Sequence, residues 1–476
     1  MPDGILPDWI FPHEGIALSN GCGHNFDLSS MAVQIEAVCR QLDALDQAIP
    51  LGIIGDNSPA WVIADLALLA SNRASVPIPP FFTPEQIAHL ILSAGIQNVI
   101  HEGKVIPVAS VFPFLNIQAI PGAPSLPPDT RKITFTSGTT GNPKGICLTR
   151  DQQLATAQGL AGILGELGVK RHLNLLPFSV LLENIAGIYV PLMLGAQCIC
   201  PPLKEVGLSG SSHFDAEKCL DTIEKTQAES VILLPQMLQA LVACIQSDTG
   251  SDQRLRSIKF MAVGGGASSI ATLNRAHQLG LPVYEGYGLS ECASVVSLNR
   301  PNANRPGSVG LPVPGVSVRL AGDNEIEVCG RGYAGILGEP PLTQSSWIKT
   351  GDLGAIDPDG FLTISGRKKN VLITSFGRNV SPEWPERMLM EGGLLAQVVV
   401  LGDGQASLNA VLVPRSEEVT RRDLASLIQH VNSQLPDYAQ ISEWQLSPTR
   451  FNIENGFATA NGRLRRDAIA RHFSTY

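Results

Sequence analysis

The first 290 residues alternate between short β-branched or aliphatic runs and longer stretches with helical periodicity. The short runs predict buried strands at residues 51–54, 133–136, 173–176, 231–234 and 259–263, and the longer ones predict helices that include 61–70 and 152–167. Strands that alternate with helices indicate parallel sheets covered on both faces. One helix start carries a capping box, with Thr83 as N-cap, Pro84 at the first position and Gln86 at the third.

The pattern changes after about residue 299. Short alternating runs at 317–320, 325–328 and 361–364, separated by turn residues such as 357–360, predict a small antiparallel β unit. A polar break follows at 366–370. Beyond it, runs at 397–401 and 408–413 and a helical stretch at 423–435 predict a separate α+β unit of ordinary domain size.

Composition and charge narrow the choice of function. The chain has 34 basic and 43 acidic residues, and its net charge of −9 argues against nucleic acid or an anionic membrane as the main partner. Residues 185–203 carry no charge, but the prolines and the glycine among them favour a helix and a buried strand over a membrane span. Acids and prolines occupy the first 20 residues where a secretory signal would need an apolar core, so we expect a cytoplasmic protein.

The nine cysteines do not show the spacing of a metal site. The closest pair, Cys198 and Cys200, lies in an apolar run, and no second pair or histidine follows at a ligand spacing. We interpret the cysteines as buried thiols in a reducing compartment.

The strongest chemical signal is the segment from Thr134 to Gly145, which reads TFTSGTTGNPKG. A predicted strand leads into a loop of hydroxyls and glycines. Glycines let backbone N–H groups approach an anion, the hydroxyls add donors, and Lys144 adds a positive charge. This chemistry suits a polyphosphate. The segment is not a Walker A loop, because Pro143 precedes the lysine and Gly145 follows it.

Two further motifs suit a nucleotide. In the segment 284–291, YEGYGLSE, Tyr287 lies between two glycines and can stack on a flat ring, and the carboxylate of Glu291 can hold Mg2+. In the segment 349–353, KTGDL, Asp352 follows a tight turn and can accept hydrogen bonds from a ribose diol. The glycines at 264–266 have no side chains, so this run leaves room for a ligand.

These motifs, in this order, resemble those of the adenylate-forming superfamily, which includes acyl-CoA synthetases, luciferases and the adenylation domains of peptide synthetases. The resemblance extends from about residue 51 to 466. It implies an α/β fold with a large lobe of doubly wound sheets, a small β-barrel-like unit and a smaller mobile α+β C-terminal domain. It also implies a two-step reaction, in which a carboxylate and ATP give an acyl-adenylate and pyrophosphate, and a thiol then displaces AMP.

The resemblance assigns domains and roles to residues of this chain. Residues 1–366 form the ATP- and acyl-binding domain, 367–370 the hinge with Lys369 at its centre, and 371–476 the small domain. Catalysis falls to Lys144, Ser290, Glu291 and Arg463, and Mg2+ binding to Thr139 and Glu291. The residues expected to bind the nucleotide are Thr136, Ser137, Gly138, Thr139, Thr140, Gly141, Gly264, Gly265, Glu285, Gly286, Tyr287, Gly288, Asp352, Arg367 and Lys369.

The sequence departs from the family at its last motif. Arg463 stands where the family has a catalytic lysine, and no lysine follows Lys369. Arginine keeps the charge and binds oxyanions, but its planar fork is placed differently from an ammonium. Three alternatives follow: Arg463 takes the lysine's role, adenylation is slow and thioester formation dominates, or adenylation has been lost.

The predicted acyl pocket also departs from the family. Val180 stands where acyl-CoA synthetases commonly have histidine, and no aspartate lies near Pro177 to bind an α-ammonium group. An apolar acyl or aryl carboxylate is therefore expected, with CoA or a carrier pantetheine as the thiol. Phe376, where the family often has glycine, would narrow the pantetheine tunnel. The rival hypotheses are an enzyme that passes the adenylate to a carrier protein or an amine, and a nucleotide-binding homologue without turnover.

Overall fold

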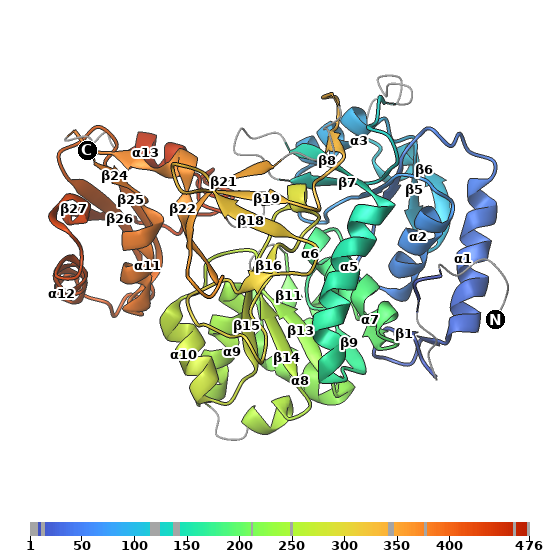
Figure 1. The fold of residues 1–476 in the computed structure, drawn as a ribbon, viewed down its shortest axis with the longest axis horizontal. Coiled ribbons are helices and arrows are strands. Elements are labelled where there is room, and N and C mark those ends of the chain that lie inside the picture. The colour runs from blue at the N-terminus through green and yellow to red at the C-terminus, as the bar shows by residue number, and fades with distance from the viewer. Residues whose placement is uncertain are drawn as a thin grey trace.

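The computed structural model describes residues 8–10, 15–114, 124–136, 143–210, 213–247, 251–340, 347–375, 378–459 and 463–473. The chain forms two large mixed sheets with flanking helices, an antiparallel sheet, and a C-terminal α+β unit (Figure 1). The C-terminal unit, orange to red in Figure 1, lies at the opposite end of the molecule from the first helices.

The seven-stranded sheet has the order β20-β8-β7-β4-β3-β5-β6. Its central pairs β5-β3, β3-β4 and β4-β7 are parallel, and the outer pairs are antiparallel. The strands are β3 (Leu51–Ile53), β4 (Ser75–Pro77), β5 (Asn98–His101), β6 (Lys104–Pro107), β7 (Thr130–Thr136), β8 (Lys144–Thr149) and β20 (Gly335–Ile336). The predicted parallel strands are confirmed, and the antiparallel edges are an addition that the sequence pattern did not show.

The nine-stranded sheet has the order β17-β16-β15-β14-β13-β9-β10-β1-β2, with a parallel centre and antiparallel strands at both edges. Its strands are β1 (Leu18–Ser19), β2 (Asn25–Phe26), β9 (Arg171–Leu173), β10 (Gln197–Ile199), β13 (Ser230–Leu233), β14 (Phe260–Val263), β15 (Val283–Tyr287), β16 (Ser297–Leu298) and β17 (Leu311–Pro312). A short hairpin, β11 (Leu208–Ser209) and β12 (His213–Phe214), precedes the helices α8 (Ala216–Thr226), α9 (Pro235–Ser247) and α10 (Ile270–Gln278).

The part of the chain that precedes the C-terminal unit, called the large part, contains further helical segments. They include α1 (Leu28–Leu42), α2 (Pro59–Ala70), α3 (Pro84–Ala94), α4 (Val108–Val111), α5 (Arg150–Leu164), α6 (Leu181–Asn184), a π-helical turn (Ile185–Tyr189) and α7 (Val190–Met193). The predicted capping box at Thr83 is present, since Thr83 and Gln86 cap each other's backbone N–H groups at the start of α3. Apolar side chains of α1, α2, α5 and the α6–α7 segment share the largest core.

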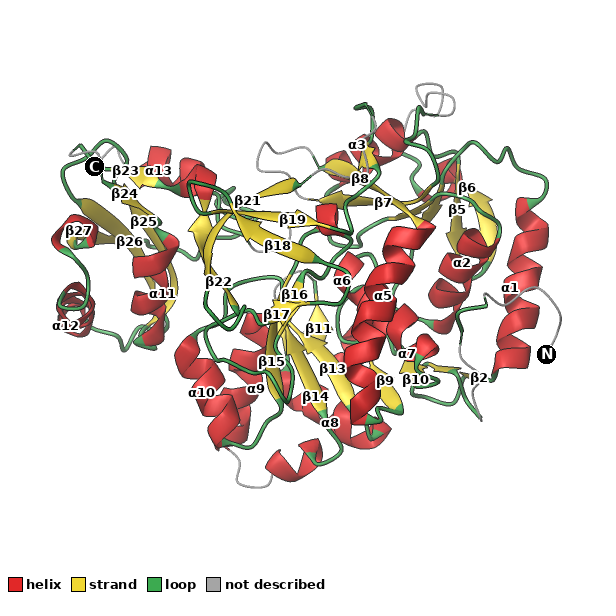
Figure 2. Cartoon of the chain, in the orientation of Figure 1, coloured by secondary structure: helices red, strands yellow, loops and turns green. Residues whose placement is uncertain are grey.

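The antiparallel unit has the order β18-β19-β21-β22, as the alternating runs predicted, with β18 (Ser317–Leu320), β19 (Glu325–Cys329), β21 (Ile348–Ile356) and β22 (Leu362–Arg367). The C-terminal unit contains β23 (Leu372–Ile373), β24 (Asn379–Val380), α11 (Glu383–Glu391), β25 (Leu395–Leu401), β26 (Leu408–Pro414), α12 (Arg421–Asn432), β27 (Ile441–Leu446) and α13 (Arg466–Phe473). Figure 2 shows helices on either side of its three-stranded sheet, and two apolar clusters fill the space between them.

The charge-free stretch 185–203 folds as predicted, into helical turns followed by the buried strand β10. Within the described residues, no helix combines the length and the apolar character needed to cross a bilayer. All nine cysteines are free thiols, but only five are buried, since Cys22 is exposed and Cys39, Cys244 and Cys329 are partly exposed. The prediction of uniformly buried cysteines is therefore wrong for those four.

Candidate nucleotide-binding site

A hydrogen-bonded group at the end of β15 joins two of the sequence motifs. The Tyr287 hydroxyl donates to Asp352 Oδ2 over 2.6 Å, and Arg367 Nε donates to Asp352 Oδ1 over 2.8 Å. Asp352 and Arg367 face each other across β21 and β22, so the antiparallel register sets their spacing. Burial raises the pKa of Asp352, while the charges of Arg367 and Arg463 and the hydrogen bond from Tyr287 lower it. Each carboxylate oxygen has a further lone pair that can accept a hydroxyl proton.

The chain turns sharply after Tyr287, and this turn presents Ser290 and Glu291. A Cβ on Gly288 would lie 1.5 Å from the carbonyl oxygen of Ser294, so only glycine fits there. Ser290–Cys292 then forms a single 3-10 turn in which Ser290 and Glu291 keep partial solvent access. Their hydroxyl and carboxylate are therefore accessible to a ligand beside Tyr287.

Arg463 is the site residue that the C-terminal unit contributes. It lies within the predicted last motif, and two hydrogen bonds hold its backbone: Thr459 N donates to Arg463 O, and Arg463 N donates to the Thr459 hydroxyl. Burial lowers the pKa of Arg463 and so does the charge of Arg367, whereas the charges of Asp352 and Glu291 oppose this shift. Arg463 thus feels the charge of both carboxylates, and the residue as a whole keeps contact with solvent.

The loop that carries Arg463 is anchored through Arg466. Its guanidinium makes a bidentate pair with Glu386 of α11 and donates to the carbonyl of Val400 over 2.7 Å. Glu383, at the start of α11, accepts a hydrogen bond of 2.6 Å from Asn370, which lies in the predicted hinge. One charged cluster therefore connects the predicted hinge, α11 and the base of the Arg463 loop.

Lys369 lies beside this group, in a 3-10 turn that joins β22 to the C-terminal unit. Burial lowers the pKa of Lys369, and so do the charges of Arg367 and Arg463, whereas Asp467 and Asp352 raise it. Arg367 is paired with Asp352, and the charges of Lys369, Arg367 and Arg463 act on one another, a distribution of positive charge that favours a bound anion.

Lys144 lies at the end of the β7–β8 hairpin that adjoins the predicted phosphate loop. As the first residue of β8 it is opposite Thr136, the last residue of β7, and its ammonium lies 4.0 Å from the Glu339 carboxylate. Both partners are more than half exposed, so this ion pair is weak and easily exchanged for a phosphate. Tyr333 N donates to the backbone carbonyl of Glu291 over 2.9 Å, and burial and the charges of Glu291 and Glu339 raise the pKa of Tyr333.

The glycine run after β14 provides the space predicted for it. A Cβ on Gly264 would lie 3.5 Å from the carbonyl of Gly286 and 3.7 Å from Leu182 Cδ2. A Cβ on Gly265, which has a φ of +80°, would lie 3.1 Å from Leu234 Cδ2. The neighbours of this run are therefore the backbone of the Tyr287 motif and aliphatic side chains.

Glu285 differs from the other predicted residues, because its side chain is buried and engaged elsewhere. Its Oε2 accepts from Gly307 N over 3.3 Å, and it lies beside the Ser268 hydroxyl and within range of the Arg387 charge from α11. Burial raises its pKa to about 7, while Ser268, Gly307 and Arg387 lower it. Glu285 therefore borders the contact between the large part and the C-terminal unit.

Glu285→Gln is expected to change the pH dependence of stability. The folded protein holds the Glu285 proton up to about pH 7, whereas an unfolded chain releases it near an ordinary glutamate pKa of about 4.3. The folded state therefore loses stability relative to the unfolded state as pH rises between these values. Urea titrations from pH 4 to 8 should show the variant gaining stability over the parent as pH rises. A constant difference across this range would contradict the raised pKa.

Several predicted residues lie outside the described part of the chain, namely Ser137, Gly138, Thr139, Thr140 and Gly141, together with the tunnel residue Phe376. Among the described residues, no cluster of three or more His, Cys, Asp or Glu side chains could hold a metal ion by itself. Glu291 fits Mg2+ in the way usual for nucleotide enzymes, where one or two carboxylates share the ion with substrate phosphates.

Sequence reasoning missed Tyr333, Glu339 and Arg387, because each reaches the site from a segment without a motif. It also missed a buried ion pair between Asp65 and Lys132. Asp65 is the only charge in the apolar helix 59–70, so its isolation could have indicated it, whereas Lys132 follows another basic residue, Arg131, in β7 and gives no such signal.

A candidate nucleotide site built on β15, β21 and β22, with an arginine from a C-terminal unit, is typical of one class of ATP-dependent enzymes, and the comparisons place the chain within it. Residues 34–338 match the family model described as AMP-binding enzyme, and residues 369–476 match the model of the AMP-binding enzyme C-terminal domain. The chain belongs to the AMP-binding enzymes, which confirms the predicted adenylate-forming superfamily.

Relatives and solved structures agree with this assignment. A long-chain-fatty-acid–CoA ligase of Mycobacterium bovis is 27% identical over 87% of this chain and 85% of that protein, and a 2-succinylbenzoate–CoA ligase of Listeria monocytogenes is 27% identical over 72% and 70%. The o-succinylbenzoate CoA synthetase of Bacillus subtilis, solved with its acyl-adenylate, aligns with a TM-score of 0.79 at 20% identity over 97% of this chain and 98% of that chain. The predicted fold class, the ligase class, and ATP, Mg2+ and CoA as ligands are confirmed at the level of the family.

Proposed function

We propose that this chain activates an apolar carboxylic acid with ATP to an acyl-adenylate and transfers the acyl group to the thiol of CoA. The observation that carries the proposal is the hydrogen-bonded group in which Tyr287 and Arg367 hold the Asp352 carboxylate, next to the turn that presents Glu291. The charges of Asp352 and Glu291 act on Arg463 of the C-terminal unit, and in this proposal Arg463 supplies a cation where negative charge develops as the carboxylate oxygen attacks the α-phosphate and pyrophosphate leaves.

Each group in the site has a definite task in this proposal. Asp352, oriented by Tyr287 and Arg367, accepts hydrogen bonds from the ribose hydroxyls. Arg463 holds the attacking carboxylate and an α-phosphate oxygen, and Lys144 exchanges Glu339 for the outer phosphates. Mg2+, when bound, neutralises phosphate charge and makes pyrophosphate a better leaving group. Preorganised charge of this kind is usually the largest contribution to catalysis.

The apolar nature of the acid is supported by the residues around the glycine run. Leu182 and Leu234 lie against Gly264 and Gly265, and Val180, which has no polar side chain, immediately precedes α6. The Mycobacterium bovis relative is a long-chain-fatty-acid–CoA ligase, which agrees with an apolar substrate.

The domain limits and the location remain proposals. We place the large domain at 1–366, the hinge at 367–370 with Lys369, and the small domain at 371–476; the match of the C-terminal family model from residue 369 supports this division. A cytoplasmic location stays a prediction from the sequence.

The test is carboxylate-dependent exchange of labelled pyrophosphate into ATP, with a panel of fatty and aryl acids. Exchange with at least one apolar acid is expected, followed by AMP release when CoA is added. Transfer only to a carrier protein or an amine would favour the rival enzyme. ATP binding without exchange across the panel would instead support a nucleotide-binding homologue.

Tyr287→Phe is expected to weaken ATP binding by about 2- to 10-fold, because it removes one hydrogen bond worth roughly 0.5–1.5 kcal/mol and frees the Asp352 carboxylate. Titration calorimetry with ATP and Mg2+ measures the change. Tyr438→Phe, in an exposed turn of the C-terminal unit, is the matched control and should bind as the parent does. Equal affinity in both variants would show that the hydrogen bond does not support the nucleotide.

A further inference from the structure

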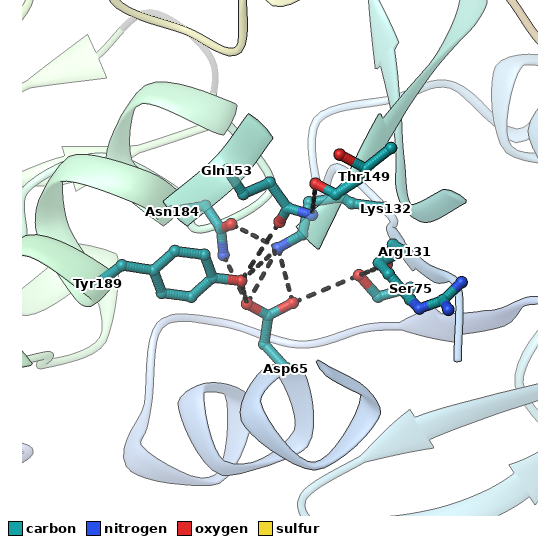
Figure 3. Close-up of polar contacts among 8 residues, drawn as sticks. All are labelled: Asp65, Ser75, Arg131, Lys132, Thr149, Gln153, Asn184 and Tyr189. Carbon is teal, nitrogen blue, oxygen red and sulfur yellow. Dashed lines mark hydrogen bonds and ion pairs between the residues drawn. The ribbon is translucent and has the colours of Figure 1, made fainter. Parts of the chain in front are cut away.

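A cluster of buried polar side chains lies at the base of the β7–β8 hairpin (Figure 3). We call it the Lys132 cluster; its members are Asp65 of α2, Lys132 of β7, Gln153 of α5, Asn184 of α6 and Tyr189 of the π-helical turn. None of them is more than 1% exposed. An ammonium and a carboxylate so deeply buried have lost their hydration and depend on one another.

The hydrogen bonds of the cluster are complete. Lys132 Nζ donates to Asp65 over 2.8 and 3.0 Å, to Asn184 Oδ1 over 2.5 Å, and to the Tyr189 oxygen over 3.0 Å. Asp65 Oδ2 also accepts from the Tyr189 hydroxyl over 2.7 Å and from Asn184 Nδ2 over 3.1 Å. No side-chain polar atom of the five members is left without a partner. A fully satisfied buried network of this kind permits few alternative arrangements of its backbone supports.

The position of the cluster gives it a direct geometric connection to the candidate phosphate segment. Lys132 pairs with Leu148 at one end of the hairpin, and Thr136 pairs with Lys144 at the other, where residues 137–143 join the two strands. Gln153 extends the cluster to β8, because its Oε1 lies 3.5 Å from the Tyr189 hydroxyl oxygen and its Nε2 donates over 3.0 Å to the carbonyl of Thr149, the last residue of that strand. The cluster therefore holds both strands at the end away from the phosphate segment.

The same cluster reaches the candidate acyl pocket. Asn184 ends α6, two residues after Leu182, which contacts the glycine run. Asp65 comes from a helix of the seven-stranded half, and Asn184 and Tyr189 come from the segment that leads into β10 of the nine-stranded sheet. The hydrogen bonds that Asn184 makes to Lys132 and Asp65 thus join the β7–β8 hairpin and α2 to α6, the helix beside the glycine run.

From this placement we propose that Lys132 and Asp65 are positioning residues, which orient the β7–β8 hairpin so that Thr136 and Lys144 meet the outer phosphates of ATP. A buried ion pair is often no more stabilising than well-packed apolar side chains of the same size. The specific contribution of this pair is therefore to set the orientation of the hairpin rather than to add stability. A tilt of the hairpin at its base is transmitted along both strands to the phosphate contacts. The inference rests on the proposed function, because it requires ATP to bind at this hairpin.

The test compares ATP with AMP, which lacks the outer phosphates. The double variant Lys132→Met/Asp65→Leu fills the site with apolar side chains of similar volume. Its Kd for ATP with Mg2+ is expected to rise at least ~10-fold, while its Kd for AMP stays within about 2-fold of the parent, both measured by titration calorimetry. A purely structural role would change both affinities equally or neither, and either result would overturn the inference.

Two further variants make the outcome decisive. Tyr189→Phe keeps the shape of the ring and removes one hydroxyl from the cluster, so it should show the same selective loss of ATP affinity on a smaller scale, even if the double variant does not fold. Ile223→Ala, in the separate core around α8, should lower stability and leave the ratio of ATP to AMP affinity unchanged. If the parent protein binds neither nucleotide, it is the proposed function that fails, and the comparison separates this result from failure of the inference.

Discussion

Replacing Arg463 with alanine is expected to lower the rate of carboxylate-dependent pyrophosphate exchange by at least ~10-fold, equivalent to about 1.4 kcal/mol of transition-state stabilisation. The guanidinium is the only cation that the described part of the C-terminal loop 458–464 brings within range of both Asp352 and Glu291. Its loss removes the charge that faces the attacking carboxylate and the α-phosphate. ATP affinity should fall less than the rate, because Asp352, Tyr287 and Lys144 remain.

Arg463→Lys distinguishes charge from geometry. An ammonium preserves the positive charge and lacks the planar fork, so the exchange rate should be kept or raised if the position acts as the family's lysine does. Arg465→Ala is the matched control, because Arg465 is an exposed arginine two positions away in the chain, and this variant should exchange at the parental rate. An unchanged rate in Arg463→Ala would show that this residue does not carry the first step.

The strands and helices with strong local patterns could be predicted from the sequence. β18 was predicted at its observed limits, and the α3 start was predicted from a capping box that depends on three neighbouring residues. The antiparallel edges could not be predicted in this way, because strands such as β2, β6 and β20 are short and take their pairing from distant partners. Periodicity reports which face is buried, but it does not identify the neighbouring strand.

The candidate site likewise contains residues whose place could be predicted from the sequence and residues whose place could not. Tyr287, Asp352 and Arg367 lie in recognisable motifs, and the structure brings them together across β15, β21 and β22. Glu285 belongs to the same motif as Tyr287, but its side chain faces Gly307 and Ser268, because tertiary packing determines its partners. A motif predicts which residue types are present, and only the fold determines which of them face the ligand.

Breaking the Lys132–Asp65 pair from one side is expected to cost about 3–5 kcal/mol of unfolding free energy. Lys132→Met leaves the Asp65 carboxylate buried without its ammonium, and Asp65→Leu leaves the ammonium without its carboxylate. Burial lowers the pKa of Lys132, and the negative charge of Asp65 opposes this effect. Without Asp65, this opposition is lost, and the charged ammonium is disfavoured. The double variant should recover most of the loss, since neither charge remains.

Urea denaturation followed by circular dichroism measures these differences in the parent, both single variants and the double variant. The Lys259–Glu229 pair is the matched control, because its ion pair of 3.0 Å is partly exposed, at 42% and 12% of the side-chain surfaces. Lys259→Met should cost less than about 1 kcal/mol, as surface ion pairs usually do. If the two single losses at Lys132 and Asp65 simply add in the double variant, the residues are not energetically coupled, and the cluster is not the ionic unit that its hydrogen bonds indicate.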